Sequence, residues 1–254
     1  MASRWRGRVP PAELAEGYRR LPVVRAEAVG AYTLLVLRND GGEVGAPGQF
    51  FMLQAVPEPS GAYLPRALSA AWADAGEIAF LLDVRGAGTA ALAGAARVSV
   101  LGPLGHGFEL HDGPTILVGG GIGAAILPWL VRDLPGPVTT VLGFREQQHA
   151  VCAALIDADA TVVLEPTYVT EPLARLLPAD ATVYACGPDP MLHAVAALCA
   201  EHAVPCLLAM EAAMACGFGA CYGCAVEIDG EWKRLCVEGP VLEAGRVLAG
   251  GHDG

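Results

Sequence analysis

The sequence of 254 residues contains few basic residues and no block of them. Lys and Arg together number 16, against 27 Asp and Glu, which gives a formal net charge of −11 at pH 7. Nucleic acids and anionic membrane surfaces bind proteins through clustered basic side chains. The composition therefore argues against both kinds of partner.

Long uninterrupted hydrophobic runs are also missing. The most apolar stretch, residues 115–131, is broken by several glycines and by Pro128, so it predicts a buried strand, a turn and the start of a helix rather than a membrane span. No apolar segment follows the basic start at residues 1–8. We therefore expect no secretory signal, a cytoplasmic location and no disulfides.

Two different sequence patterns divide the chain. With 54% hydrophobic residues, the chain can bury one large or two ordinary cores. Between about residues 23 and 110, short strand-like runs separated by turn residues predict a small antiparallel barrel. From residue 114 onward, apolar strands alternate with helical stretches, which predicts an open parallel α/β sheet. We expect an all-β domain over 1–112, an α/β domain over 113–208 and a small C-terminal segment over 209–254. The predicted strands are 32–37, 49–53, 78–82, 97–101, 115–118, 138–143, 161–164 and 182–186, and the predicted helices are 124–133, 171–177 and 189–202.

Four of the eight cysteines form the most specific motif. A C-x4-C-x2-C run with a fourth cysteine further along is the plant-type [2Fe–2S] spacing, and it is formed by Cys216, Cys221, Cys224 and Cys236. Glycines within the run allow a loop to fold tightly around a cluster and bring amide N–H groups close to sulfur. The motif therefore predicts a one-electron carrier.

A structural zinc site is the alternative for these cysteines, because C-x2-C is also a zinc spacing. Most zinc ribbons carry two such pairs, whereas Cys216 and Cys236 are isolated. Cys152, Cys199 and Cys206 show no ligand spacing and are expected to be core thiols.

Two weaker motifs favour nucleotide chemistry. A glycine-rich turn at residues 119–123 lies between a predicted strand and a predicted helix, where backbone N–H groups can approach a pyrophosphate, although close packing alone would explain it equally well. In the barrel half, Arg66, Ser69, Gly88 and Thr89 suit a flavin dinucleotide, since Arg presents a planar fork to phosphate. The other interpretation treats Arg66 as a solvated charge and residues 86–89 as a plain turn.

The order of these motifs resembles the ferredoxin–NADP reductase superfamily. Within it, the cysteine segment is similar to that of the electron-transfer subunits of NAD-dependent dihydroorotate dehydrogenase B. The resemblance covers about residues 23 to 247. It is carried by residues 66–69, 88–89, 102–108, 119–123, 186–191, 214–221 and 233–241.

The resemblance implies FAD in the barrel, a [2Fe–2S] cluster on the C-terminal segment and NAD as diffusible acceptor. It further implies an FMN-containing catalytic subunit that oxidises dihydroorotate in pyrimidine synthesis, with electrons passing from FMN through the cluster and FAD to NAD. The cluster ligands would be the four cysteines. The residues expected at FAD are Arg66, Ala67, Leu68, Ser69, Leu81, Leu82, Asp83, Gly88 and Thr89, and those expected near the nicotinamide nucleotide are Gly120, Gly121, Gly123, Cys186, Gly187 and Pro188, with Glu211 just ahead of the cluster segment.

The sequence departs from the family pattern in three places. Ala67 replaces the usual proline of the flavin motif, residues 125–126 replace Pro-Leu, and residues 163–168 lack an Asp-Gly-Ser-type loop. The last change reshapes the expected nucleotide pocket and leaves NADP or another carrier open as acceptor. Two other functions also stay open: a reductase subunit of another redox complex, of sulfide dehydrogenase or ferredoxin:NADP oxidoreductase type, and a zinc-stapled binding module.

Overall fold

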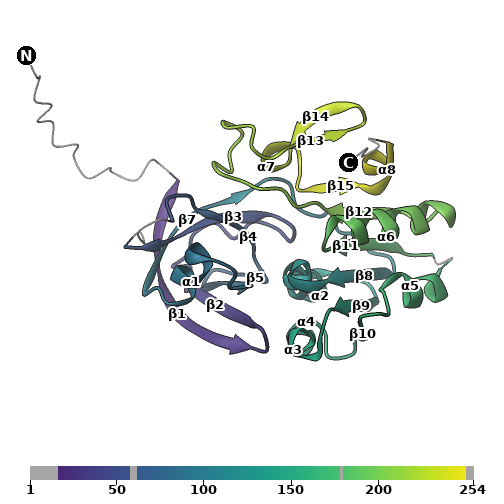
Figure 1. The fold of residues 1–254 in the computed structure, drawn as a ribbon, viewed down its shortest axis with the longest axis horizontal. Coiled ribbons are helices and arrows are strands. Elements are labelled where there is room, and N and C mark those ends of the chain that lie inside the picture. The colour runs from purple at the N-terminus through teal and green to yellow at the C-terminus, as the bar shows by residue number, and fades with distance from the viewer. Residues whose placement is uncertain (1–16, 58–61, 178–179, 250–254) are drawn as a thin grey trace, which may run out of the picture.

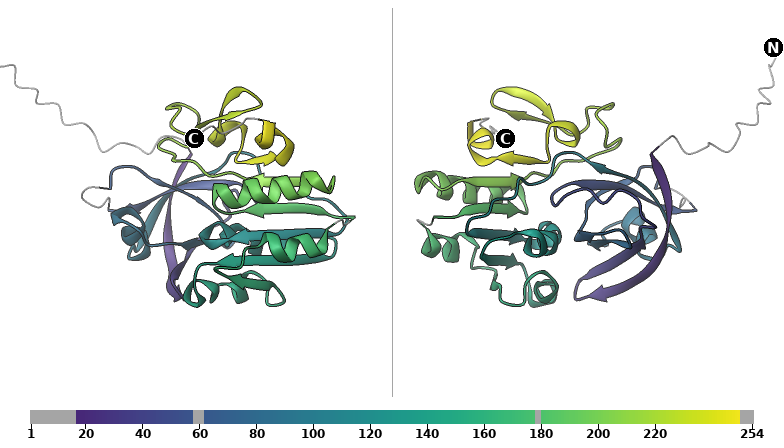
Figure 2. Two further views of the ribbon diagram at one scale, coloured as in Figure 1. Left: turned by 45° about the vertical axis from the view of Figure 1, so that its right-hand side comes forward. Right: turned by 180° about the vertical axis from the view of Figure 1, so that it is seen from behind.

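The computed structural model describes residues 17–57, 62–177 and 180–249 (Figure 1). The predicted domain limits at the two ends, and the N-terminal residues 1–8 discussed above, lie outside these ranges. Within the described ranges, no helix has the length and apolar character needed to cross a membrane. The described residues form two large sheets side by side, with a C-terminal segment that contains a two-stranded sheet lying along the edge of both (Figures 1 and 2).

The first sheet is antiparallel and strongly curved. It has seven strands in the order β4-β3-β7-β1-β2-β6-β5, and the edge strands β4 and β5 do not pair with each other, so the predicted barrel is incompletely closed. The strands are β1 (Tyr18–Val29), β2 (Tyr32–Arg38), β3 (Phe50–Val56), β4 (Arg66–Ser69), β5 (Trp72–Ala73), β6 (Glu77–Leu82) and β7 (Arg97–Leu104), with the short helix α1 (Ala87–Ala93) between β6 and β7.

Strand β1 begins five residues before the predicted start of the barrel at residue 23. Its first half pairs with β7 and its second half with β2, and the register shifts between Val23 and Arg25. Most of its side chains are partly or fully exposed. The hydrophobic pattern of a buried strand is therefore absent, which is why sequence periodicity did not reveal its full length.

The second sheet is the predicted α/β unit, with strand order β10-β9-β8-β11-β12-β15. Its strands are β8 (Thr115–Gly120), β9 (Val138–Phe144), β10 (Thr161–Leu164), β11 (Thr182–Cys186), β12 (Cys206–Ala209) and the antiparallel edge strand β15 (Val241–Glu243). Its helices are η1 (Gly121–Ile126, 3-10), α2 (Leu127–Asp133), α3 (Gln147–Ala150), α4 (Ala153–Ile156), α5 (Thr170–Leu176) and α6 (Asp189–Glu201). Helices α5 and α6 cover one face, and η1, α2, α3 and α4 cover the other (Figure 2).

The predicted helix at 124–133 is divided into η1 and α2. Helix α2 begins at Leu127 with Pro128 in its first turn, where a missing N–H is tolerated. The glycine-rich turn before it adopts the tighter 3-10 form instead. The α-helix proper therefore starts three residues later than the apolar pattern indicated.

The C-terminal segment joins the α/β sheet rather than standing apart. A hairpin of β13 (Ala225–Ile228) and β14 (Glu231–Arg234) leads through α7 (Leu235–Glu238) into β15, which pairs with β12. The last described element is α8 (Ala244–Ala249), which packs against α6. The boundaries at residues 112 and 208 stay predictions, and no sequence periodicity indicated that β15 would extend the sheet.

The two sheets share buried cores. The side chain of Trp129, on α2 of the α/β unit, is 1% exposed and packs with Leu37 and Phe80 inside the curved sheet. Its indole N–H donates to Asp133 at 2.8 Å, and Arg132 donates to the carbonyl of Ala73 in β5 at 3.0 Å. The two units are therefore joined by a packed contact and not by a linker alone.

Replacing Trp129 by alanine tests this joint. Trp129→Ala leaves a large cavity between the two units, and the free energy of unfolding should fall by about 3–5 kcal/mol. Urea unfolding followed by circular dichroism measures the change. Trp232→Ala is the matched control, because that side chain is 72% exposed and its loss should change stability by about 0.5 kcal/mol at most. Equal effects of the two substitutions would contradict a shared core.

Candidate functional site

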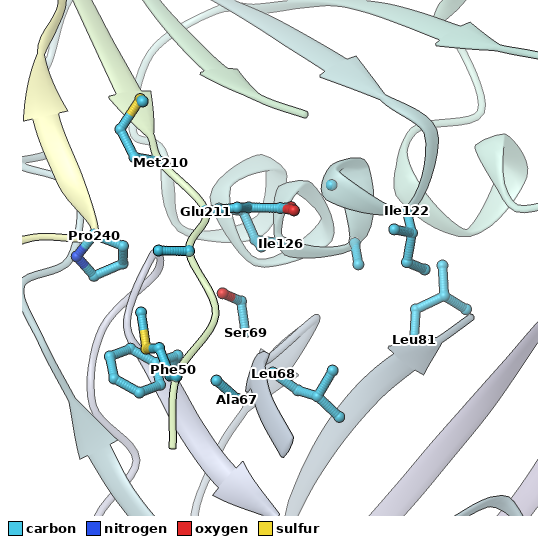
Figure 3. Close-up of a pocket in the computed structure, with 14 residues that line it drawn as sticks. Phe50, Ala67, Leu68, Ser69, Leu81, Ile122, Ile126, Met210, Glu211 and Pro240 are labelled. Atoms are coloured by element: carbon cyan, nitrogen blue, oxygen red, sulfur yellow. The ribbon is translucent and has the colours of Figure 1, made fainter. Parts of the chain in front are cut away.

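A cavity of about 220 Å³ lies where the two sheets meet. Strands β4 and β6 form one wall, η1 forms a second, and residues 210–214 cross between them (Figure 3). Four residues expected at FAD line it, Ala67, Leu68, Ser69 and Leu81, and so does Gly123, which was expected near the nicotinamide nucleotide. Glu211, which was expected just ahead of the cluster segment, also lines it. Sequence reasoning missed the remaining lining residues, because η1 and the 210–214 stretch become neighbours of β4 only in the folded chain.

Two polar side chains point into this cavity. The Ser69 hydroxyl and the Glu211 carboxylate both point into it (Figure 3). Burial, and to a smaller degree the nearby Asp189, raises the pKa of the Glu211 carboxyl above its ordinary value. The cavity therefore presents one hydroxyl and one carboxyl with weakened acidity between otherwise apolar walls.

The guanidinium of Arg66 lies against the first turn of α1. A Cβ built on Gly88 would fall 2.3–2.5 Å from its atoms, so a side chain at this position would displace the guanidinium. The hydroxyl of Thr89 donates to the carbonyl of Gly86 at 3.2 Å and accepts from the backbone N–H of Arg85 at 3.1 Å. The structure thus brings Arg66, Gly88 and Thr89 together. Residues 86–89 form the start of a helix and not a plain turn.

Leu82 and Asp83 take different positions from the rest of the predicted flavin set. The Leu82 side chain is fully buried in the core of the curved sheet, so only its backbone can face a ligand. Asp83 pairs with Arg85 at 2.6 Å, and the Arg85 side chain is largely exposed.

A second cavity of about 640 Å³ opens at the carboxyl ends of the parallel strands. From β8 the chain adds parallel strands first on one side, at β9, and then on the other, at β11. The crevice at such a point is the usual ligand position in open α/β sheets. The predicted residues Gly120, Gly121 and Pro188 line it. The remaining lining includes Arg145, Glu165 and Tyr168, which carry no motif that sequence alone would single out.

Close packing explains part of the glycine-rich turn. A Cβ on Gly123 would fall 2.5 Å from the Cα of Gly187, and one on Gly120 would fall 2.4 Å from the sulfur of Met191. Gly121 has a positive φ of 52° and open space around its Cα. Cys186 is buried and lines neither described cavity, and burial raises the pKa of its thiol well above the ordinary value. It is therefore a packing thiol in this structure.

The four cysteines of the predicted cluster lie in two interacting pairs. The Cys216 thiol interacts with that of Cys221, and the Cys236 thiol with that of Cys224. Within the described residues, no three His, Cys, Asp or Glu side chains converge on a point that could hold one metal ion. Two thiol pairs suit a two-iron cluster, in which each iron takes two protein ligands, better than a single tetrahedral zinc.

Backbone N–H groups surround the Cys216 sulfur. Burial alone would raise the pKa of this thiol, but hydrogen bonds from the N–H groups of Phe218, Cys221 and Ala220 and from the Cys221 side chain lower the pKa to about 6. The Cys221 sulfur accepts from the N–H of Gly223 at 3.4 Å. These donors favour thiolate, which is the form that binds iron. The donor set therefore fits a [2Fe–2S] cluster.

The loop that carries these cysteines is close to the first cavity. A Cβ on Gly217, which has a φ of 81°, would fall 2.5 Å from Met52 on β3. Met214, two residues before Cys216, lines the cavity itself. The thiol loop and the cavity between the sheets are therefore adjacent.

Comparison with known proteins agrees with this arrangement. Residues 211–248 match the family model described as the iron–sulfur cluster binding domain of dihydroorotate dehydrogenase B. The chain is 34% identical to the dihydroorotate dehydrogenase B (NAD(+)) electron transfer subunit of Geobacillus thermodenitrificans, over 91% of this chain and 99% of that protein. It is 32% identical to the subunit of the same description from Shouchella clausii, over 90% of this chain and 97% of that protein.

Solved structures agree on the fold. A chain in the structure of NADH-dependent reduced ferredoxin-NADP oxidoreductase superimposes with a TM-score of 0.77 at 22% identity, covering 89% of this chain and 88% of that chain. Phthalate dioxygenase reductase superimposes with a TM-score of 0.60 at 13% identity, covering 84% and 87%. The two relatives are 32% and 34% identical to this chain over 90% and 91% of its length. The chain therefore belongs to the family of dihydroorotate dehydrogenase B (NAD(+)) electron transfer subunits.

Proposed function

We propose that this chain transfers electrons to NAD from a catalytic subunit. That subunit oxidises dihydroorotate, as a step of pyrimidine synthesis. The observation that carries the proposal is the adjacency of the paired thiols to the cavity between the two sheets, since Met214, two residues before Cys216, lines that cavity. Electron carriers must lie close together for transfer, and two cofactors bound at these adjacent positions would meet that requirement.

The two cofactors are FAD and a [2Fe–2S] cluster. When bound, a flavin can take electrons singly and release a hydride, and the cluster supplies one-electron steps. We assign the cluster to Cys216, Cys221, Cys224 and Cys236. The pairing of these thiols and the N–H groups that surround Cys216 support the assignment.

We assign the flavin ring to the first cavity and its phosphates to the start of α1. Arg66 and Thr89 offer side-chain donors there, and Gly88 leaves space beside the Arg66 fork. Ala67, Leu68, Ser69 and Leu81 would line the ring, with Asp83 at the edge of the site and Leu82 contributing only backbone. The Glu211 carboxyl, with its raised pKa, would face the ring from the opposite wall.

The second cavity is the proposed nicotinamide nucleotide position. Gly120 and Gly121 would admit the nucleotide at the end of β8, and Pro188 lies at the start of α6 across the cavity. Three further predicted residues would support this position without lining the cavity. The close backbone contact of Gly123 with Cys186 and Gly187 would hold the glycine-rich turn in place. The NAD(+) in the description of the relatives supports NAD as the acceptor.

Exposed aromatic rings mark the proposed contact with the catalytic, FMN-containing subunit. The side chains of Phe218 and Tyr222 lie on the thiol loop and are 57% and 61% exposed. Exposed aromatic residues are enriched at protein interfaces. A partner that covers them would also exclude water from the cluster.

The decisive experiment is anaerobic turnover with both chains. The holoprotein, co-expressed with an FMN-type dihydroorotate dehydrogenase subunit, should form NADH on addition of dihydroorotate, and neither chain alone should do so. Cys221→Ser should retain FAD but form NADH at least roughly 10-fold more slowly, because ligand loss weakens the cluster by about that factor or more.

Normal NADH formation by Cys221→Ser would remove the cluster from the electron path. Bleaching of the flavin and cluster absorbance without NADH would move the acceptor away from NAD. No bleaching, in a holoprotein that contains both cofactors, would contradict dihydroorotate oxidation by the partner as the electron source.

FAD retention tests the proposed phosphate site. Arg66→Ala removes a charged donor, and hydrogen bonds to charged groups contribute about 1.5–3 kcal/mol, so FAD affinity should fall roughly 10- to 100-fold. Equilibrium titration of the deflavinated variant with FAD measures the change. Arg25→Ala is the matched control, since Arg25 is half-exposed and forms an ion pair with Glu27. Unchanged FAD affinity in Arg66→Ala would remove Arg66 from the site.

Partner binding tests the aromatic surface. Phe218→Ala should weaken binding of the catalytic subunit roughly 10-fold or more while the iron content stays unchanged, because interface aromatics contribute a large share of binding energy. Surface plasmon resonance gives the affinity. Tyr63→Ala, which removes a ring that is 76% exposed on the β3–β4 connection, should bind as the unsubstituted chain does. Equal affinities for all three proteins would place the partner elsewhere.

A further inference from the structure

Arg234, the last residue of β14, contacts the thiol loop through its guanidinium group. Its Nη1 donates to the carbonyl of Gly219 at 3.2 Å, and its guanidinium carbon lies 5.0 Å from the ring centroid of Tyr222. Gly219 lies between the first two cysteines of the motif and Tyr222 between the second and third. One side chain therefore contacts both turns of the loop.

Gly219 links Arg234 to a sulfur atom. The N–H of Gly219 donates to the Cys236 thiol, and its carbonyl accepts from Arg234. Its φ is 87°, and an added Cβ would fall 2.7 Å from Val237 and 3.3 Å from the Arg234 guanidinium. The residue that supplies a hydrogen bond to sulfur is thus held in a left-handed conformation beneath Arg234.

Glu238 holds Arg234 in this orientation. Its Oε1 accepts from Arg234 Nη2 at 2.8 Å, and its Oε2 accepts from the Arg234 backbone N–H at 2.7 Å. Both side chains are about one-third exposed or less, and the bond to Arg234 holds the pKa of the Glu238 carboxyl below its usual range. Because Glu238 is on α7, the helix that contains Cys236, the pair connects the loop to the fourth cysteine.

Other basic groups of the same region are paired away from the loop. Lys233, the only lysine of the sequence, pairs with Glu231, and Arg246 pairs with Asp229 at 2.7 Å. Arg234 is also paired, with Glu238, but it differs from these two groups because its guanidinium contacts the thiol loop itself. A positive charge and a hydrogen bond to sulfur both make electron uptake by a thiolate-bound cluster easier.

We propose that Arg234 is a positioning residue that holds the thiol loop closed and that, balanced by Glu238, sets the reduction potential of the cluster. The inference rests on the proposed function only in requiring a [2Fe–2S] cluster at the four cysteines. Arg234 acts in two separable ways, by its charge and by its fork-shaped hydrogen bonding. Glu238 opposes the charge but supports the geometry, so removing either partner has a different consequence for the potential.

The test is a redox titration of the purified holoprotein followed by electron paramagnetic resonance. Arg234→Gln should shift the midpoint potential of the cluster to more negative values, because a positive charge is lost. Glu238→Gln should shift it to more positive values, because Arg234 is left without its counter-charge. Lys233→Gln is the matched control, as it removes the same charge one residue away, and it should leave the potential near that of the unsubstituted protein.

The rate of iron loss distinguishes the effect of the Arg234 hydrogen bonds from the effect of its positive charge. Arg234→Lys keeps the charge but not the planar donor pair, so it should hold the potential closer to the unsubstituted value than Arg234→Gln does. It should nevertheless lose iron to a chelator roughly 10-fold faster, as expected when groups that orient metal ligands are removed. If Arg234→Gln retains no cluster, Glu238→Gln and Arg234→Lys still decide the proposal through their potential and iron loss.

Potentials that stay unchanged in Arg234→Gln and Glu238→Gln, or that move in the same direction, would overturn the proposed role of the pair. Both results leave the proposed function intact, since the unsubstituted protein still shows its cluster signal. Absence of a [2Fe–2S] signal from the unsubstituted, anaerobically prepared chain would instead overturn the proposed function and this inference together.

Discussion

The packing of η1 and α2 against the curved sheet is the contact on which the rest of the structure depends. Trp129 inserts an indole ring from the α/β unit into the core of the other sheet, and Arg132 donates to the backbone of β5. The first cavity exists because η1 is held opposite β4 and β6. A looser joint would separate the walls that are assigned to one flavin ring.

The C-terminal segment adds a second constraint. It crosses from the thiol loop, which packs on Met52 of the curved sheet, to β15, which extends the parallel sheet beside β12. Because this segment is attached to both units, the thiols are held at a constant distance from the cavity between the sheets. That arrangement suits an electron carrier, for which small changes in cofactor separation have large effects on rate.

Much of the fold could be predicted from local patterns. The strands β8 and β11 and the helix α6 are recognisable by period and length alone, and they occur within two residues of their predicted bounds. Strand β1 and strand β15 could not be predicted in this way. Most side chains of β1 are partly or fully exposed, and β15 is three residues long, so neither carries a hydrophobic repeat.

The candidate site also contains some residues that the sequence indicated and others that only the structure identified. The sequence alone predicted the chemistry of the cluster, because a C-x4-C-x2-C run with a fourth cysteine further along is typical of [2Fe–2S] ligands, and it indicated Arg66 with Gly88 through family resemblance. Only the tertiary structure decided which groups surround these residues. The contacts of Arg234 with Gly219 and Tyr222, and of Glu211 with the wall of the cavity, join residues with no fixed spacing between them. Ligand identity is a local property of a short motif, whereas charge, burial and hydrogen bonding around the ligands arise only when distant segments pack together.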